Sequence, residues 1–311
     1  WGYLAHEKQP WDTDYLAQGG LRDWYEGHFR RYEVLDLGKP LGRVNEALAR
    51  ETGLSRDCVV ATGLIDAHSG GVGSIGSLLT EANKPEWDRL LTGTLALIAG
   101  TSNCHMAVSR DACFVPGVWG PYYGAMVPGF WLNEGGQTAT GSLLDHLIQG
   151  HPASRVLREQ HPGANLFDLL NQEVARLQAR DPGFNRNLHV LPYFHGNRSP
   201  RANPLLKGGI SGLTLEKGTE SLAALYLSAV QALACGTRHI IETMEAHGYR
   251  IRDLVVCGGH TKNRLLLQEH ADILGRPLHL TTESENMLLG GAINAATAAG
   301  RYDTLPEAMS R

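Results

Sequence analysis

The sequence predicts an α/β protein, and three observations lead to this class. Short apolar runs rich in β-branched residues, at 59–62 and 254–257, alternate with longer stretches of helical periodicity. Glycines directly follow the clearest helical stretches, at Gly248 and Gly275, where a helix can end in a left-handed turn. Many of the 37 glycines lie at apparent strand-to-helix junctions, which is typical of α/β proteins that bind phosphate.

Composition and charge narrow the class of protein further. The 311 residues, 42% hydrophobic and 19% charged, suit one large or two modest folded domains. A net charge of −4 gives no reason to expect a nucleic acid or an anionic membrane as partner. No signal peptide or membrane-spanning apolar run is found, and the five cysteines have no paired spacing. We therefore expect free thiols in a reducing cytoplasm.

The first 86 residues are expected to hold the end of one domain and a linker. Helical fragments are predicted around 11–16 and 45–52, with a turn at 40–42 between them. Residues 59–68 are predicted as a buried strand that delivers Asp66 to its carboxyl end. The small residues that follow predict a helix ending near Leu79. Residues 80–86 have the polar, proline-containing composition of a linker, so we divide the chain into domains 1–82 and 83–311.

Beyond the linker the sequence predicts strands joined by small-residue turns. Residues 95–99 and 104–108 are predicted as a hairpin, and residues 124–132 as a third strand. A helix to about Gln149, a polar insertion without strong periodicity to Asn187, a strand over 188–194 and a loop at 195–200 should follow. The last third predicts, in order, helix 222–247, strand 254–257, helix 263–274, strand 277–280 and helix 287–299.

Asp66 is the candidate catalytic residue. A lone acid beyond the carboxyl end of a strand lies where open α/β sheets bind ligands, and it can act as a general base. The same residue can simply cap the following helix, and on the residues alone both interpretations stay open. Residues 71–76 fit the dinucleotide pattern G-x-G-x-x-G. However, the five residues 66–70 intervene between the strand and the first glycine, and no acid ends a strand about 20 residues later. Close helix packing therefore explains these glycines better.

Three further segments combine glycine with polar residues at predicted strand ends. Residues 100–103 offer N–H groups and hydroxyls to an anion, or form an ordinary polar turn. Residues 134–137 form a helix start or a ligand-facing corner. The pair Gly258-Gly259 either holds a nucleotide against the next helix or forms a tight loop. The fourteen histidines are scattered without a zinc-binding motif, so no metal site is predicted.

Five motifs together resemble the FGGY carbohydrate kinases, and among these the ribulokinase-like branch that phosphorylates D-ribulose and related ketopentoses. They are DAH at 66–68, AGTSNCHM at 99–106, PGVWGPY at 116–122, PGFWLNEGGQ at 128–137 and HGNRSP at 195–200. The resemblance runs nearly from end to end. It implies two actin-like (ribonuclease-H-like) domains that close on ATP, Mg²⁺ and sugar, with a homodimer compatible with the family.

The resemblance also implies a role for individual residues. Asp66 would accept the proton of the attacking sugar hydroxyl, and Glu134 would hydrogen-bond the sugar. Three groups of residues would bind ATP. The phosphate loop would be Gly100, Thr101 and Ser102, and the residues bordering the nucleotide would be Gly135 and Gln137. The adenosine side would be Gly258, Gly259 and Asn263. These roles suit phosphoryl transfer, which requires that the reactants are positioned, that the charge on the phosphates is neutralised, and that one acid points at the attacking hydroxyl.

Two departures from the family pattern shape the expectation. Asn103 replaces a threonine in the phosphate loop, and the N-terminal D-x-G-[ST] hairpin is missing from the sequence, which opens without methionine. We therefore expect the carboxyl-terminal portion of a kinase: the end of the first, sugar-binding domain, one complete second domain, and no activity alone. The alternatives are a non-catalytic nucleotide or sugar sensor of the same fold and an NAD-dependent oxidoreductase.

Overall fold

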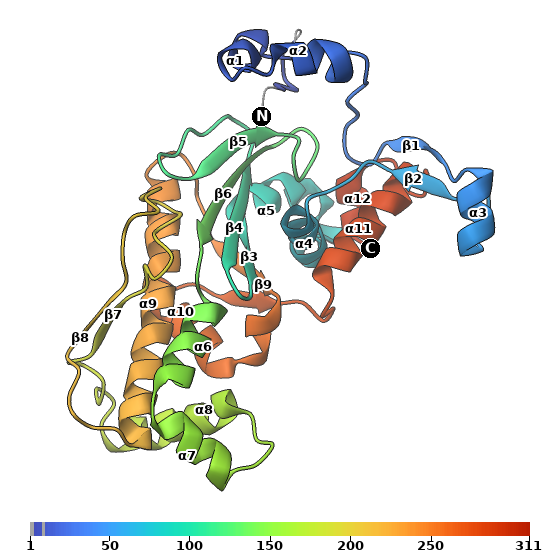
Figure 1. Ribbon diagram of the computed structural model, residues 1–311. Coiled ribbons are helices and arrows are strands. Elements are labelled where there is room, and N and C mark those ends of the chain that lie inside the picture. The colour runs from blue at the N-terminus through green and yellow to red at the C-terminus, as the bar shows by residue number, and fades with distance from the viewer. Residues whose placement is uncertain (1–2, 8–9) are drawn as a thin grey trace.

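The computed structural model describes residues 3–7 and 10–311 and is built around one mixed six-stranded sheet (Figure 1). The strand order is β10-β9-β3-β4-β6-β5. The strands are β3 (Thr94–Ala99), β4 (Asn103–Ser109), β5 (Trp119–Tyr123), β6 (Trp131–Gln137), β9 (Asp253–Cys257) and β10 (Leu278–Leu280). Strands β10, β9 and β3 run parallel, and β4, β6 and β5 continue the sheet antiparallel. The predicted α/β class is confirmed.

Helices cover both faces of this sheet. The described helices are α1 (Thr13–Gln18), α2 (Arg22–Trp24), α3 (Glu46–Thr52), α4 (Asp66–Ile75), α5 (Trp87–Gly93), α6 (Gly141–Gly150), α7 (Ala153–Gln160), α8 (Leu166–Arg180), α9 (Thr219–Glu245), α10 (Arg264–Leu274), α11 (Asn286–Ala298) and α12 (Leu305–Met309). Shorter helical turns are η1 (Tyr25–Phe29), η2 (Gly76–Leu78), η3 (Glu81–Glu86) and η4 (Gly259–Lys262). Helices α4, α5, α11 and α12 share a core with one face, and the end of α9 shares a core with the other.

The predicted hairpin at 95–108 is confirmed, with Leu95 opposite Ala107 and Ala99 opposite Asn103. The predicted third strand is wrong in position. Residues 124–130 form the turn between β5 and β6, where Gly124 and Gly129 adopt positive φ angles. Strand β6 begins only at Trp131 and continues through Gln137. Glu134 therefore lies within a buried strand, not at a strand end as expected.

The strand predicted at 59–68 is shorter and more exposed than expected. Strand β2 (Val59–Ala61) pairs antiparallel with β1 (Pro40–Arg43) in a separate two-stranded sheet, and Val60 is 41% exposed. The predicted turn at 40–42 is thus wrong, because these residues pair with β2 through an irregular register at Gly42. The prediction of a buried strand rests on its apolar composition, but β-branched residues are equally typical of a two-stranded ribbon that is covered on one side only. The predicted helix after Asp66 is confirmed as α4.

Helices α4 and α11 cross at contact distance because glycines line the crossing. A Cβ at Gly73 would overlap the Asn286 carbonyl, and one at Gly290 would overlap the Ser69 carbonyl. Ser69 also donates its hydroxyl to the Met287 carbonyl at 2.7 Å. The glycines of 71–76 therefore lie inside a buried helix, as the packing interpretation predicted, and not in a strand-to-helix turn. This arrangement removes the structural basis of the dinucleotide alternative.

Helix α9 extends past the sheet and organises a second apolar cluster. Its amino-terminal half packs against α6, α7 and α8, which pass beside it in Figure 1. The predicted polar insertion at 150–187 is wrong, because α7 and α8 occupy most of it. The buried residues are Ala153, Ser154 and Leu157 on α7 and Leu170, Val174 and Leu177 on α8. The three on α8 recur at helical spacing, a signal that the prediction did not use. Strands β7 (His189–Leu191) and β8 (Gly209–Ser211) form a small ribbon beside α9.

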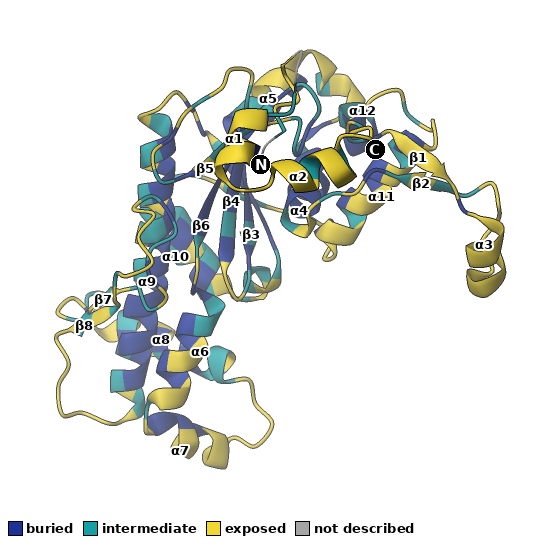
Figure 2. Cartoon of the chain, turned by 45° about the horizontal axis from the view of Figure 1, so that its top comes forward, coloured by how far each residue is buried: buried dark blue, intermediate teal, exposed yellow. Residues whose placement is uncertain are grey.

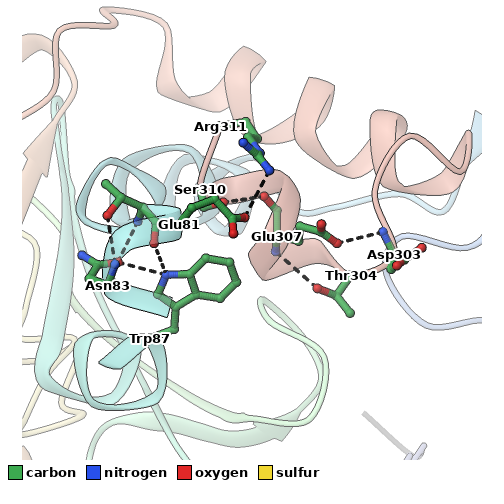
Figure 3. A network of polar contacts seen from close by, with 9 residues as sticks. Glu81, Asn83, Trp87, Asp303, Thr304, Glu307, Ser310 and Arg311 are labelled. Atoms are coloured by element: carbon green, nitrogen blue, oxygen red, sulfur yellow. Dashed lines mark hydrogen bonds and ion pairs between the residues drawn. The ribbon is translucent and has the colours of Figure 1, made fainter. Parts of the chain in front are cut away.

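The predicted linker at 80–86 is ordered by polar contacts. The Thr80 hydroxyl and the Asn83 side chain cap each other's backbone at the start of η3. Figure 3 shows Trp87 donating its indole N–H to Asn83, at 3.0 Å, and Arg311 reaching Glu81 at 3.2 Å. These bonds attach η3 to α12. Helices α4 and α11 also pack together across the predicted domain boundary at residue 82, and that boundary stays a prediction.

Buried and exposed residues are unevenly distributed over the elements of the molecule. In Figure 2, β3, β4, β6 and the middle of α9 are buried, whereas α1, α2 and α3 are largely exposed. Among the helices of the described residues, none combines the length and the apolar character needed to cross a bilayer.

Candidate active site

Three loops meet at one edge of the central sheet. Strands β3 and β9 run parallel, so the turns after Ala99 and after Cys257 leave the sheet side by side. Strand β6 ends at this edge too, because Gln137 pairs with Asn103 at the start of β4. The Thr140 hydroxyl then donates to the Gly100 carbonyl at 2.8 Å. The segments at 100–103 and 258–259, each predicted at a strand end, therefore lie together at this edge.

Glycine is required where these loops touch. Gly258 has a φ of +94°, and a Cβ there would lie 2.5 Å from the Ala99 carbonyl oxygen. A Cβ at Gly141 would lie 2.8 Å from the Gly100 carbonyl oxygen. The hydroxyl-bearing residues Thr101 and Ser102 are exposed at the tip of the turn. The edge therefore presents an exposed turn of hydroxyls and backbone groups supported from below, which suits an anionic group.

Glu134 holds the centre of a charged cluster on β6. The carboxylate accepts a hydrogen bond from the Arg198 guanidinium, and its other oxygen lies 3.2 Å from His68 Nε2. The Arg198 guanidinium stacks 3.9 Å from the centroid of the Trp119 ring. Burial raises the pKa of Glu134, but the His68 hydrogen bond and the Arg198 charge outweigh it and leave the pKa below its usual value. Glu134 is thus a buried carboxylate anion.

Asp66 begins α4 and is exposed. Its Oδ1 accepts a hydrogen bond from the Ala67 amide at 2.7 Å. The N-cap residue of α4 is Ile65, whose side chain has no oxygen that could accept a backbone hydrogen bond. Asp66 is therefore not the N-cap, and it favours the helix only through its negative charge in the first turn. His68, two residues further along the same turn, contacts Glu134. The structure therefore places the two candidate acids on neighbouring elements.

Three residues predicted to contact the nucleotide are engaged inside the protein. Gly135 lets α9 approach, because a Cβ there would lie 2.6 Å from Ile240 Cγ2. Gln137 donates to the Leu233 carbonyl at 2.8 Å and accepts from Asn103. Asn263 caps α10 and donates to Tyr226 at 2.7 Å. Their observed contacts support the loops at the sheet edge.

Buried histidines line the inner side of the same edge. Burial, reinforced by the charges of His270 and Arg198, lowers the pKa of His105 to about 3. Burial and His270 likewise lower the pKa of His260 to about 4, against a backbone hydrogen bond with Gly100 that raises it. His105 Nε2 lies 3.0 Å from the Thr237 hydroxyl. His105 and His260 are therefore neutral at pH 7, and burial lowers the pKa of His270 as well.

The structure adds residues that the sequence did not assign to the site. Arg198 and His68 hold Glu134, and Thr140 joins two loops. Both Arg198 and His68 lie within motifs that carried the family resemblance, but a motif does not reveal which member pairs with which. Arg198 lies 64 positions from Glu134 in the sequence, and His68 lies 66 positions from it, so both contacts are long-range.

Comparison with known proteins identifies the family to which the chain belongs. Residues 95–299 match the model described as "FGGY family of carbohydrate kinases, C-terminal domain". The chain is 46% identical over 308 residues to the "FGGY carbohydrate kinase domain-containing protein" of Xenopus laevis, covering 97% of this chain and 56% of that one. It is 34% identical over 318 residues to a D-ribulokinase of Saccharomyces cerevisiae, covering 94% and 44%. The chain spans about half the length of the curated relatives it matches.

Solved structures give the fold. A xylulose kinase from Rhodospirillum rubrum superposes with a TM-score of 0.66 at 24% identity, covering 89% of this chain and 50% of that one. A gluconate kinase from Lactobacillus acidophilus superposes with a TM-score of 0.73 at 17% identity, covering 98% and 55%. The actin-like fold expected from the resemblance is confirmed. The chain belongs to the FGGY family of carbohydrate kinases.

Proposed function

We propose that this chain is part of an ATP-dependent sugar kinase in which Asp66 accepts the proton of the sugar hydroxyl that attacks the γ-phosphate. The observation that carries the proposal is the contact between His68 and Glu134 at 3.2 Å. It ties the first turn of α4, which begins with Asp66, to strand β6. Strand β6 then leads directly to the loops at the sheet edge, so acid, sugar contact and phosphate loop belong to one connected structure.

The spacing along β6 supports this division of roles. Glu134 pairs with Met106, and three residues later Gln137 pairs with Asn103 beside the turn at 100–102. At about 3.3 Å per residue, three residues separate the two positions by about 10 Å. A sugar bound at Glu134 can thus present a hydroxyl to a terminal phosphate held near Thr101 and Ser102.

ATP would bind along the edge formed by the three loops. The turn of Gly100, Thr101 and Ser102 would hold the phosphates through backbone N–H groups and hydroxyls. Gly258 and Gly259 would accept the adenosine side, because glycine leaves the backbone open there. The contributions of Gly135, Gln137 and Asn263 would then be indirect, through the internal contacts described above.

Mg²⁺ is expected with ATP. Within the part of the chain that the structure describes, no group of three or more His, Cys, Asp or Glu side chains could hold a metal ion. Magnesium bound with a nucleotide takes several ligands from phosphates and water, so no protein cage is required.

The substrate we propose is a ketopentose, with D-ribulose as first choice. The support is the likeness to the yeast D-ribulokinase and to bacterial ribulokinases. We further propose that residues 1–82 belong to a sugar-binding domain and 83–311 to a nucleotide-binding one, and that the chain alone is inactive. A cytoplasmic location and a homodimer stay predictions.

A coupled ADP-release assay with a panel of ketopentoses, polyols and hexuloses tests the proposal. The panel is run on this chain and on the intact protein that contains it. We expect turnover with D-ribulose in the intact protein and none in the chain alone. Robust turnover by the chain alone would refute its inactivity. Binding of ATP and sugar without turnover in the intact protein would instead support the sensor alternative.

A further inference from the structure

Glu134 is contacted from two separate elements. Arg198, in the loop after β7, donates to one carboxylate oxygen, and His68, on α4, lies against the other. The side chains of Glu134, Arg198 and His68 are 11%, 19% and 5% exposed. Each carboxylate oxygen can accept two hydrogen bonds. The Cys104 thiol is a further hydrogen-bonding neighbour of Glu134, so one of the four acceptor positions of the carboxylate stays free.

Arg198 is held in place by more than its charge. Its guanidinium lies 3.9 Å from the centroid of the Trp119 ring, a cation–π arrangement. On the sheet side, a Cβ at Gly136 would lie 2.6 Å from Arg198 Cδ. The Ser199 amide donates to the Gly136 carbonyl at 3.1 Å, which fixes the loop to β6. The guanidinium is therefore confined between an indole ring and a strand, and it has little freedom to leave Glu134.

His68 faces two hydrogen-bond acceptors. Its Nδ1 lies 3.1 Å from the Ala125 carbonyl oxygen and its Nε2 lies 3.2 Å from Glu134 Oε2. A carbonyl and an ionised carboxylate only accept hydrogen bonds, so the imidazole is the hydrogen-bond donor to whichever of them it bonds. Glu134 thus has the Arg198 cation on one side and the His68 imidazole on the other.

The remaining titratable groups around Glu134 are Cys104 and His105 on β4 and Tyr122 on β5. Burial first, and then the nearby Glu134 charge, raises the pKa of Cys104 and of Tyr122. His105 stays neutral because burial lowers its pKa to about 3. Glu134 is therefore the one anion among these described neighbours, and Arg198 and His68 are the groups that balance it.

We infer that Arg198 and His68 are positioning residues for sugar binding: they keep Glu134 ionised and in one orientation, with an acceptor position of the carboxylate left for a sugar hydroxyl. This inference rests on the proposed function, because it takes the sugar contact of Glu134 from there. It predicts that removing the Arg198 charge changes the pH at which Glu134 takes up a proton, and with it the pH dependence of sugar binding.

The first test measures urea unfolding of this chain between pH 4 and pH 8 for Arg198→Met. Methionine removes the charge and keeps an unbranched stem. The urea midpoint of the variant should fall most at pH 8, and the difference from the parent should shrink as the pH falls, because the buried Glu134 of the variant is protonated at a higher pH. When Arg198→Met is made in a chain that already carries Glu134→Gln, the fall in the urea midpoint should be the same at every pH. A loss independent of pH in both backgrounds would overturn the inference.

The second test uses the form of the protein that releases ADP. For Arg198→Met the KM for sugar should rise at least tenfold at pH 6 and less at pH 8. The kcat at saturating sugar and the KM for ATP should change by less than threefold. The exposed Arg201→Met is the matched control and should match the parent. A rise in the sugar KM that is equal at all pH values would overturn the inference.

The two tests separate the two proposals. If the pH-dependent coupling of Arg198 to Glu134 is found but the parent binds and phosphorylates no sugar, the proposed function fails and the charge pairing stands. If the parent is active but Arg198→Met behaves like Arg201→Met in both tests, the positioning role fails and the proposed function stands.

Discussion

At the scale of single residues, one site contains a buried group that is ionised, Glu134, and a buried group that is neutral, His105. Glu134 is buried with two basic partners and remains an anion. His105 lies on the neighbouring strand, is fully buried, and stays neutral beside the Thr237 hydroxyl. Since burial acts on both, the different outcome is set by the partner: a cation for the carboxylate and a hydroxyl for the imidazole.

The buried His105 should make the folded chain sensitive to acid. Below pH 6.5 the unfolded chain takes up a proton on this residue that the folded chain does not accept until about pH 3. The free energy of unfolding therefore falls with decreasing pH across this window, by about 1.4 kcal/mol per pH unit for one group. In His105→Gln this slope should be reduced by that amount, measured by urea unfolding at several pH values.

The control for this change is His161→Gln, at the exposed end of α7. Its slope should equal that of the parent. An unchanged slope in His105→Gln would mean that His105 is not the group that resists protonation in the fold.

Residue roles were the part of the site least accessible from sequence. The motifs led to Asp66, Glu134 and the glycine-containing turns, because these residue types stand out by chemistry. Arg198 could not be assigned, since it pairs with a carboxylate 64 positions away. Asn263 was assigned to the adenosine side, but its cap of α10 and its bond to Tyr226 could not be predicted. Such partners are decided by how elements pack, which a local pattern does not contain.

At the scale of elements, strong periodicity was a good guide and weak periodicity was not. Helices α9, α10 and α11 and strands β3, β4 and β9 follow the prediction closely. The errors lie at β1 and β5, which have no fully buried residue, and at α7–α8, where a narrow apolar stripe lies among polar residues. Their structure depends on neighbouring elements more than on a pattern of their own.

The crossing of α4 and α11 offers a sharp test at this scale. Gly290 and Gly291 are adjacent in one helix, but only Gly290 faces Ser69 closely, where a Cβ would overlap the carbonyl oxygen. Gly290→Ala should therefore lower the free energy of unfolding by about 1–3 kcal/mol through overpacking. In Gly291→Ala the nearest atom is 3.8 Å from the Cβ. That change should be neutral or stabilising by up to about 1 kcal/mol. Thermal or urea unfolding of both variants gives the comparison, and equal effects would contradict the described crossing.

At the scale of the whole molecule, α4 connects the two ends of the site. Its first turn carries Asp66 and contacts Glu134 through His68. Its remaining turns pack in the core with Met106, Trp87 and α12. A displacement of this helix would therefore move the proposed base relative to the phosphate loop. The sequence predicted the helix and its glycines, but the packing of α4 against α11 is known only from the structure.

The central claim is that Asp66 acts on the sugar hydroxyl during phosphoryl transfer. The most direct measurement compares kcat for ADP release with the dissociation constants of sugar and ATP in Asp66→Asn and in Asp168→Asn, an exposed first-turn acid of α8. We predict that Asp66→Asn lowers kcat by about 10²–10⁴-fold while both dissociation constants stay within threefold, and that Asp168→Asn resembles the parent. A kcat within tenfold of the parent for Asp66→Asn would contradict the claim.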